Sequence, residues 1–137
     1  RQVEDDLSAA VTERDGAVYG EDCVGFFLQP DPGVMTVYQI YWNPLGTVFD
    51  QRITFNESMI YTVDRTWDGD YEAVGTRSAE GWAVEVRVPF STLGAPPRPG
   101  SAWGMNMRRK QARTAATADW QVPIDYNPRS FGELRFE

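Results

Sequence analysis

The sequence predicts an all-β protein, an antiparallel β-sandwich of two sheets with an immunoglobulin-like or jelly-roll-like arrangement. Residues 81–90 alternate strictly between apolar and other side chains, which is typical of a half-buried strand. Further short runs of β-forming residues follow one another closely, with turn signals between them. The 12 Gly and 9 Pro residues punctuate the chain at short intervals, which favours strands and turns over long helices.

The clearest element is the strand at 81–90. It places Trp82, Val84 and Val86 on one side, together with Val88 and Phe90. Because proline cannot donate to a β-ladder, Pro89 ends this strand or marks an edge. Residues 91–94 then predict one helical turn, and residues 71–77 predict a partner strand across the turn at 78–80.

The other expected strands are short. Residues 35–43 and 47–54 form a hairpin across the Asn-Pro-Leu-Gly turn at 43–46. Residues 24–28 form a short apolar strand, and residues 102–110 place Trp103, Met105 and Met107 on one face. We expect a closing strand at 131–136 and a weaker one at 7–12. Trp82 and Trp103 are expected in the core.

Composition narrows the classes of function. The 137 residues suit one domain, 1–137, and the net charge of −7 opposes general nucleic-acid binding. The basic run at 108–110 is interpreted as a solvated strand end. No apolar run of about 18 residues is present, so this chain contains no membrane-spanning helix.

Catalytic residue types are sparse. The chain has no histidine, which removes the usual Ser-His and Cys-His nucleophiles and the usual zinc ligands. Cys23 is the only cysteine and lies in an apolar run, so we expect it to be a buried thiol. The paired carboxylates of Glu21 and Asp22 lie on adjacent residues, which is a poor arrangement for a glycosidase. We therefore predict no enzymatic activity.

Calcium is the one metal that the residues leave open. Glu21 with Asp22, and Asp64 with the Asp-Gly-Asp turn at 68–70, supply the carboxylate oxygens that calcium prefers. The full EF-hand spacing is absent, and the turn is the simpler interpretation of 68–70. No particular metal ligand is assigned.

Aromatic side chains near loops and strand ends are the remaining candidates for ligand contact. A sugar ring has an apolar face that stacks on Trp or Tyr, whereas its hydroxyls need polar partners nearby. The aromatic candidates are Tyr19, Tyr41, Trp67, Trp120 and Tyr126. The candidates for polar contact are Asp22, Gln39 and Asn43. Packing against the rim of the sandwich is an equally good interpretation of each aromatic residue alone.

Several segments in order resemble the family 9 carbohydrate-binding modules and their wider superfamily. They are Arg14-Asp15-Gly16, the acidic turn at 21–26, the hairpin at 38–50, the strand at 81–94, and the segments around Trp103, Trp120 and residues 128–134. The subgroup that the motifs match best places this domain before a bacterial outer-membrane β-barrel of unassigned function. The resemblance implies a two-sheet sandwich, often stabilised by calcium, that binds carbohydrate in the bacterial cell envelope or outside the cell.

The resemblance also assigns a site. Two aromatic residues that sandwich the sugar in the family align with Tyr19 and with the neighbourhood of Asp125 and Tyr126. A glutamate and an arginine that hold sugar hydroxyls in the family align with Gly25 and Tyr41. These two departures favour a second interpretation, in which the domain packs against a barrel or an enzyme without binding sugar.

The family has additional strands before the point that aligns with Arg1, so the N-terminal strands of the sandwich are expected to be missing here. Open strand edges invite pairing, and we expect another segment or a partner copy to supply them. A third hypothesis is a haem-binding sandwich that uses Met59, Met105, Met107 and Lys110. The shared face of Met105 and Met107 favours a core position instead.

Overall fold

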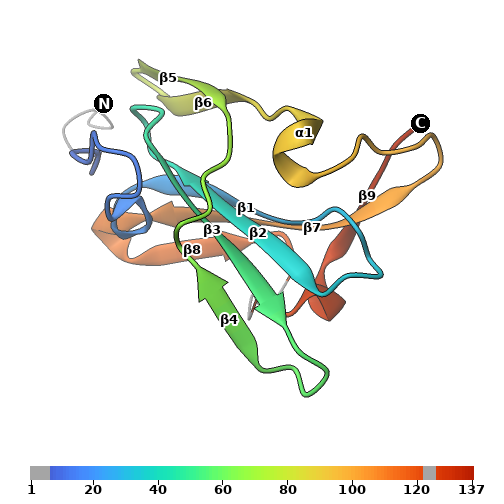
Figure 1. The fold of residues 1–137 in the computed structure, drawn as a ribbon. Coiled ribbons are helices and arrows are strands. Elements are labelled where there is room, and N and C mark those ends of the chain that lie inside the picture. Colours follow the sequence, from blue (N-terminus) through green and yellow to red (C-terminus); the bar gives the residue numbers. More distant parts are fainter. Residues whose placement is uncertain (1–6, 122–125) are drawn as a thin grey trace.

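The structure is a computed structural model that describes residues 7–121 and 126–137. It is an antiparallel β-sandwich of one large and one small sheet, as the sequence predicts (Figure 1). The strands of the large sheet lie in the order β4-β3-β2-β1-β7-β8, and β9 pairs with another part of β7. Their bounds are β1 Cys23–Gln29, β2 Thr36–Trp42, β3 Val48–Phe55, β4 Tyr61–Asp64, β7 Ala102–Gln111, β8 Ala116–Asp119 and β9 Gly132–Arg135.

The small sheet is a hairpin of β5 (Glu72–Ser78) and β6 (Gly81–Arg87). Together with the short helix α1 (Phe90–Leu93) it lies over one face of the large sheet (Figure 1). Three 3-10 turns complete the assigned elements, at Val18–Gly20, Ala112–Thr114 and Pro128–Ser130. Among the residues that the structure describes, no helix is long and apolar enough to cross a membrane.

Side chains alternate between the two faces of the large sheet because the strands are pleated. On the face toward the hairpin, Ile40 and Trp42 pack with Leu28, Leu93 and Trp103. On the opposite face, Phe27 and Ile53 pack in a second cluster with Val18 and other buried residues. The sheet is therefore buried on both faces, and the segment before β1 helps to cover the second one.

Two buried carboxylates hold that N-terminal segment in place. Asp22 accepts hydrogen bonds from the backbone N–H groups of Ser8 and Ala112, both at 2.8 Å. Glu21 accepts from the N–H groups of Ala10 and Val11 and from the amide of Asn43. These bonds satisfy backbone groups that would otherwise be buried without partners. They also explain why residues 7–12 form no strand, contrary to expectation.

The hairpins and the other expected strands are present, with small shifts of their ends. The strands β4 and β8 were not predicted, since both are only four residues long and mostly exposed. Trp103 is buried as expected. Trp82 is only half-buried, although a core position was expected, because it lines an open groove between the two layers.

The hairpin of β5 and β6 packs closely on the turn between β2 and β3. A Cβ atom at Gly75 would lie 2.1 Å from the backbone oxygen of Pro44, so only glycine allows this approach. The contact involves backbone on both sides, and neither side chain rotation nor a small shift can relieve it. Gly75 thus fixes the distance between the two layers at this end.

We expect Gly75→Ala to lower the free energy of unfolding by about 1–3 kcal/mol, the usual cost of forcing additional atoms into a packed contact. Chemical denaturation, monitored by tryptophan fluorescence, measures this change in the free energy of unfolding. Gly20→Ala is the matched control, because a Cβ there meets nothing within 4 Å. Equal stability of the two variants would contradict the close contact.

Candidate functional site

The large sheet carries a small basin on the face opposite the β5–β6 hairpin. Its volume is about 330 Å³, at the lower end of the range for ligand pockets. Aromatic rings, amides and cationic groups share its walls. Its lining residues are Tyr19, Gln39, Tyr41, Phe49, Gln51, Arg65, Arg108, Lys110, Thr117 and Tyr126.

Tyr41 and Gly25 shape the floor of the basin. The two residues are opposite one another in the β1–β2 ladder, and a Cβ at Gly25 would lie 2.2 Å from the Tyr41 ring. Glycine at position 25 therefore lets this ring lie across β1. Tyr41 is only 4% exposed, and its burial raises the pKa of its hydroxyl, an effect that Gln39 partly opposes.

Two glutamines are also buried in the floor. The Gln51 amide nitrogen donates a hydrogen bond to the Gln39 side-chain oxygen, and the residues face one another across β2 and β3. Among the described residues, the Gln51 side-chain oxygen has no hydrogen-bond partner although it is buried. A buried acceptor without a partner costs about 1–3 kcal/mol, so it favours a donor from a bound molecule or an ordered water.

Tyr19 and Tyr126 form part of the rim. Tyr19 is 46% exposed and its ring lies edge-on to Phe49, with 4.9 Å between ring centroids. Tyr126 contacts the rings of Phe27 and Tyr61 and has a φ of 62°. Such a positive φ is uncommon for a bulky residue and is often found at binding sites. Asp125, which the family resemblance also points to, lies outside the described residues.

The sequence-predicted residues separate into two groups. Tyr19, Gln39, Tyr41 and Tyr126 converge on the basin. The other four lie elsewhere. Asp22 and Asn43 are buried and bind backbone groups of the N-terminal segment and of the β2–β3 turn. Trp67 packs on Tyr38 at the opposite face, and Trp120 borders a different pocket.

Sequence reasoning missed the basic side of the basin. Arg108 and Lys110 were interpreted as a solvated strand end, but both lie on the β7 face that lines the basin. Arg108 donates two hydrogen bonds to Asp119 at 2.7 and 2.8 Å. The available signal was that residues 108 and 110, two positions apart on a predicted strand, must face the same side. It could not show that β8 would supply a partner for only one of them.

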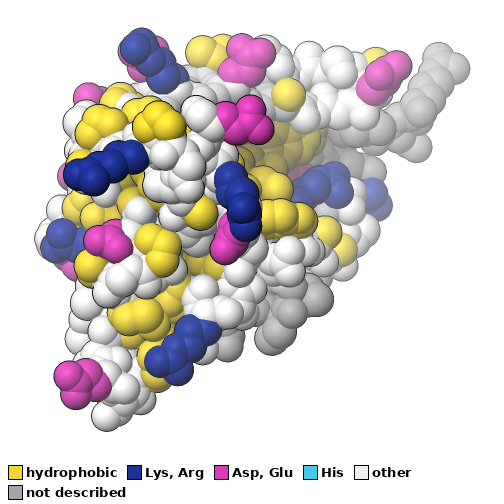
Figure 2. Space-filling view, turned by 90° about the vertical axis from the view of Figure 1, so that its right-hand side faces the viewer, with side chains coloured by type: hydrophobic (Ala, Val, Ile, Leu, Met, Phe, Trp, Pro, Cys, Tyr) yellow, Lys and Arg dark blue, Asp and Glu magenta, His cyan; other side chains and the backbone are white. Residues whose placement is uncertain are grey.

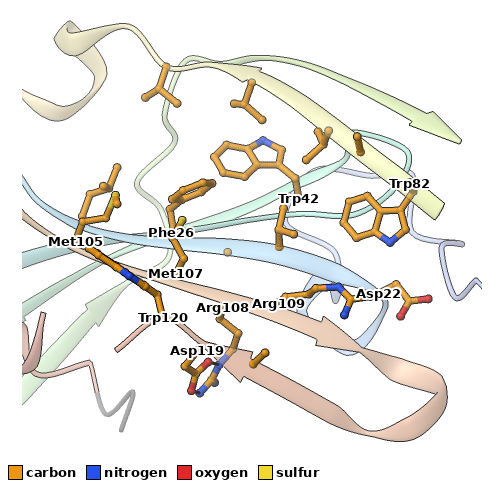
Figure 3. A pocket seen from close by; sticks show the side chains of 18 of the residues that line it. Asp22, Phe26, Trp42, Trp82, Met105, Met107, Arg108, Arg109, Asp119 and Trp120 are labelled. Carbon is orange, nitrogen blue, oxygen red and sulfur yellow. Dashed lines mark hydrogen bonds and ion pairs between the residues drawn. The ribbon is translucent and has the colours of Figure 1, made fainter. Parts of the chain in front are cut away.

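A second and larger pocket lies between the two layers of the sandwich. It is a groove of about 1190 Å³ with mostly apolar walls. Figure 3 shows Trp82 of the hairpin on one side and Phe26 and Met105 of the large sheet on the other. Hydrophobic side chains are also visible on one side of the molecule between scattered charged ones (Figure 2). The lining also includes the charged residues Asp22, Arg108 and Asp119, whose side chains already bind other groups of the protein.

The methionines offer no joint ligand set with Lys110. Met105 and Met107 line the groove, whereas Lys110 lines the basin on the opposite face of the same sheet. Met59 packs against the cluster that contains Phe55. The geometry therefore does not support the haem hypothesis.

Three carboxylates come together at the end of β3. Single oxygens of Asp15, Asp50 and Asp68 lie within 4.8 Å of one another. Arg14 lies among them, with nitrogen–oxygen distances of 2.7 Å to Asp50, 3.1 Å to Asp68 and 3.7 Å to Asp15. Burial raises the pKa of Asp50, whereas the Gly69 N–H and Arg14 oppose this rise.

These residues do not fit a calcium site. Calcium takes six to eight oxygen ligands, and the cluster has three carboxylates with a cation already against two of them. One oxygen of Asp50 is buried without a partner among the described residues, but the guanidinium repels a second cation. The cluster is an ion-pair network that joins the N-terminal segment to β3 and to the loop after β4.

We expect Arg14→Ala to destabilise the protein by about 1 kcal/mol, because it leaves the buried Asp50 carboxylate without its cation. This is the low end of the usual cost of leaving a buried group without its partner, and it applies because the Arg14 side chain is 38% exposed. Thermal unfolding measures the change, and Arg77→Ala, at an exposed residue of β5, is the control. The Tm of the unaltered protein should not change when EDTA is added. A lower Tm in EDTA would contradict the ion-pair assignment.

Comparisons with known proteins place this geometry in context. No protein-family model and no curated protein match the chain. A Bacteroides uniformis protein, described as a candidate carbohydrate-binding protein, has a similar structure with a TM-score of 0.69 and 21% identity. The match covers 96% of this chain and 68% of that one.

Family 9 carbohydrate-binding modules are also similar. A module from Caldicellulosiruptor kristjanssonii matches in its cellotriose complex (TM-score 0.56) and in its glucose complex (TM-score 0.57), each at 20% identity. Both matches cover 96% of this chain and 63% or 64% of the module. The chain therefore has the β-sandwich fold of these non-catalytic modules. It spans less than two thirds of their length.

Proposed function

We propose that the protein is a non-catalytic carbohydrate-binding module and that the basin on the large sheet is its sugar site. The main support for this proposal is that Tyr19, Tyr41 and Tyr126 converge in one concave site. The hydrogen-bonded pair of Gln39 and Gln51 lies in the same site. A sugar needs both an aromatic surface for its apolar face and hydrogen-bonding groups for its hydroxyls. Solved modules of similar fold hold glucose and cellotriose, which supports the proposal.

Each part of the basin has a role in this proposal. The exposed ring of Tyr19 and the ring of Tyr126 form the apolar contact, and their rigidity limits the entropy lost on binding. The unpartnered oxygen of Gln51 accepts a hydrogen bond from a sugar hydroxyl. The Tyr41 ring, placed across Gly25, fills the space where a longer polar side chain would stand. The module thus differs from the family pattern in its floor and keeps aromatic rings at the rim.

Isothermal titration against mono- and oligosaccharides, including glucose and cellotriose, tests the proposal. We expect Tyr19→Ala to weaken binding about tenfold, which corresponds to ~1.4 kcal/mol. Phe90→Ala is the matched control, because Phe90 is 44% exposed on α1, in the other layer of the sandwich. Circular dichroism verifies that both variants fold. No binding of any sugar in the panel, or an equal effect of the two substitutions, would reject the basin as the site.

In this proposal the module serves a larger exported bacterial protein, either a polysaccharide-degrading or an outer-membrane protein, as the family resemblance implies. The apolar groove favours a second role in that setting, as an interaction surface. In the described part of the chain, β6 pairs only with β5 and its other edge has no strand beside it. A two-stranded sheet is marginally stable alone and offers its free edge to another strand.

We propose that an extended segment of the longer polypeptide pairs with β6 and fills the groove. The occupant needs apolar side chains at alternate positions, because one side of it would contact Trp82 and Val86 from β6 and Met105 and Met107 from the large sheet. The longer chains of the similar solved structures support this choice.

The dye 1-anilinonaphthalene-8-sulfonate, which fluoresces in apolar grooves, measures whether the groove is filled. We expect strong fluorescence with the 137-residue chain and little with the product of the complete gene. Val86→Glu in the 137-residue chain should reduce the signal, and Val74→Glu on the exposed face of the same hairpin should not. Strong fluorescence from both proteins would overturn this role. Dimerisation of the 137-residue chain with loss of the signal, seen by size-exclusion chromatography with mass detection, would assign the groove to a second copy instead.

A further inference from the structure

The basin carries positive charge in a strongly acidic protein. The chain has 20 Asp and Glu against 13 Lys and Arg residues. The described lining of the basin nevertheless contains Arg65, Arg108 and Lys110 and no carboxylate. A neutral sugar requires no such local reversal of charge.

The three cations differ in how far they are already neutralised. Arg108 is paired with Asp119 through two hydrogen bonds, so its charge is largely balanced. Lys110 donates one hydrogen bond to the backbone oxygen of Tyr19, at 2.8 Å, and an ammonium group has three such donors. Arg65 is exposed, and its guanidinium has no hydrogen bond or ion pair among the described residues. Two cations are therefore available to a ligand.

These two cations come from opposite sides of the basin floor. Lys110 is on β7, and Arg65 directly follows β4. In the sheet, β3, β2 and β1 lie between those two strands; β3 supplies Gln51 to the floor, and β2 supplies Gln39 and Tyr41. A ring bound on the floor would thus meet a cation at either side. Hydrogen bonds from a charged donor to an anion are roughly twice as strong as neutral ones.

We propose that the ligand of the basin is an anionic sugar, one that carries a carboxylate or a sulfate group, with Arg65 and Lys110 as the residues that select it. This inference rests on the proposed sugar-binding function and specifies its substrate class. The aromatic rim and the glutamine pair bind the ring, and the two cations distinguish the charged sugar from its neutral counterpart. The selection operates in a partly exposed site, so it weakens as salt screens the charges.

Sugars that differ only at carbon 6 test the inference directly. Glucose, glucuronic acid and glucose 6-sulfate form one such set, and galactose and galacturonic acid form another. In isothermal titration at 20 mM salt, we expect the best charged member of a set to bind at least tenfold more tightly than its neutral member. The two glucose derivatives distinguish carboxylate from sulfate as the preferred group.

Two variants assign the preference to named residues. Arg65→Gln and Lys110→Gln should each reduce the ratio of charged to neutral affinity at least threefold. Arg77→Gln removes an exposed charge from β5, in the other layer, and should leave the ratio unchanged. Raising the salt to 500 mM should also reduce the ratio.

Each other outcome is informative. A neutral sugar that binds as tightly as its charged partner, or more tightly, overturns the anionic preference and leaves the sugar-binding function standing. A loss of the ratio in Arg77→Gln equal to that in Arg65→Gln overturns the assignment, because general charge then explains it. Failure of both charged and neutral members of every set overturns the inference together with the proposed function.

Discussion

The alternation of side chains along β2 separates the two sites of this protein. Neighbouring residues on a strand point to opposite faces, so Ile40 and Trp42 pack toward the hairpin while Gln39 and Tyr41 face the basin. A shift of the register by one residue would move every one of these side chains to the wrong face. Both the apolar groove and the polar basin depend on this single constraint.

Buried carboxylates hold the segment that covers the second face of the large sheet. The large sheet carries buried apolar residues on both faces, and the second face is partly covered by a segment without regular structure. Glu21 and Asp22 accept the backbone hydrogen bonds that such a segment cannot make by itself. Arg14 ties the same segment to Asp50 and to the loop after β4. Glu21, Asp22 and Asp68, three of the acidic residues considered as calcium ligands, thus bind groups of the protein itself.

The two concave surfaces differ in chemistry, and this difference is the reason that we propose the basin, and not the groove, as the sugar site. The groove is larger, but its walls are mostly apolar, and among the described residues no strand pairs with the other edge of β6 beside it. Those features suit a polypeptide strand, whose backbone pairs with the edge and whose side chains fill the space. The basin is smaller and mixes aromatic rings with amides and cations. Size alone would favour the groove, but a carbohydrate needs hydrogen-bonding partners as well as contact area.

The sequence by itself determined the sandwich, its two main hairpins and the central strand β7, because alternation and turn residues are local properties. It also determined that Tyr19, Gln39, Tyr41 and Tyr126 were candidates. Only the tertiary structure decided that these four meet, and that Asp22, Asn43, Trp67 and Trp120 do not join them. The strands β4 and β8 escaped prediction, since four mostly exposed residues carry little apolar pattern. Whether a polar side chain serves the fold or a ligand depends on partners distant in sequence, such as Asp119 for Arg108 and the N-terminal backbone for Asp22.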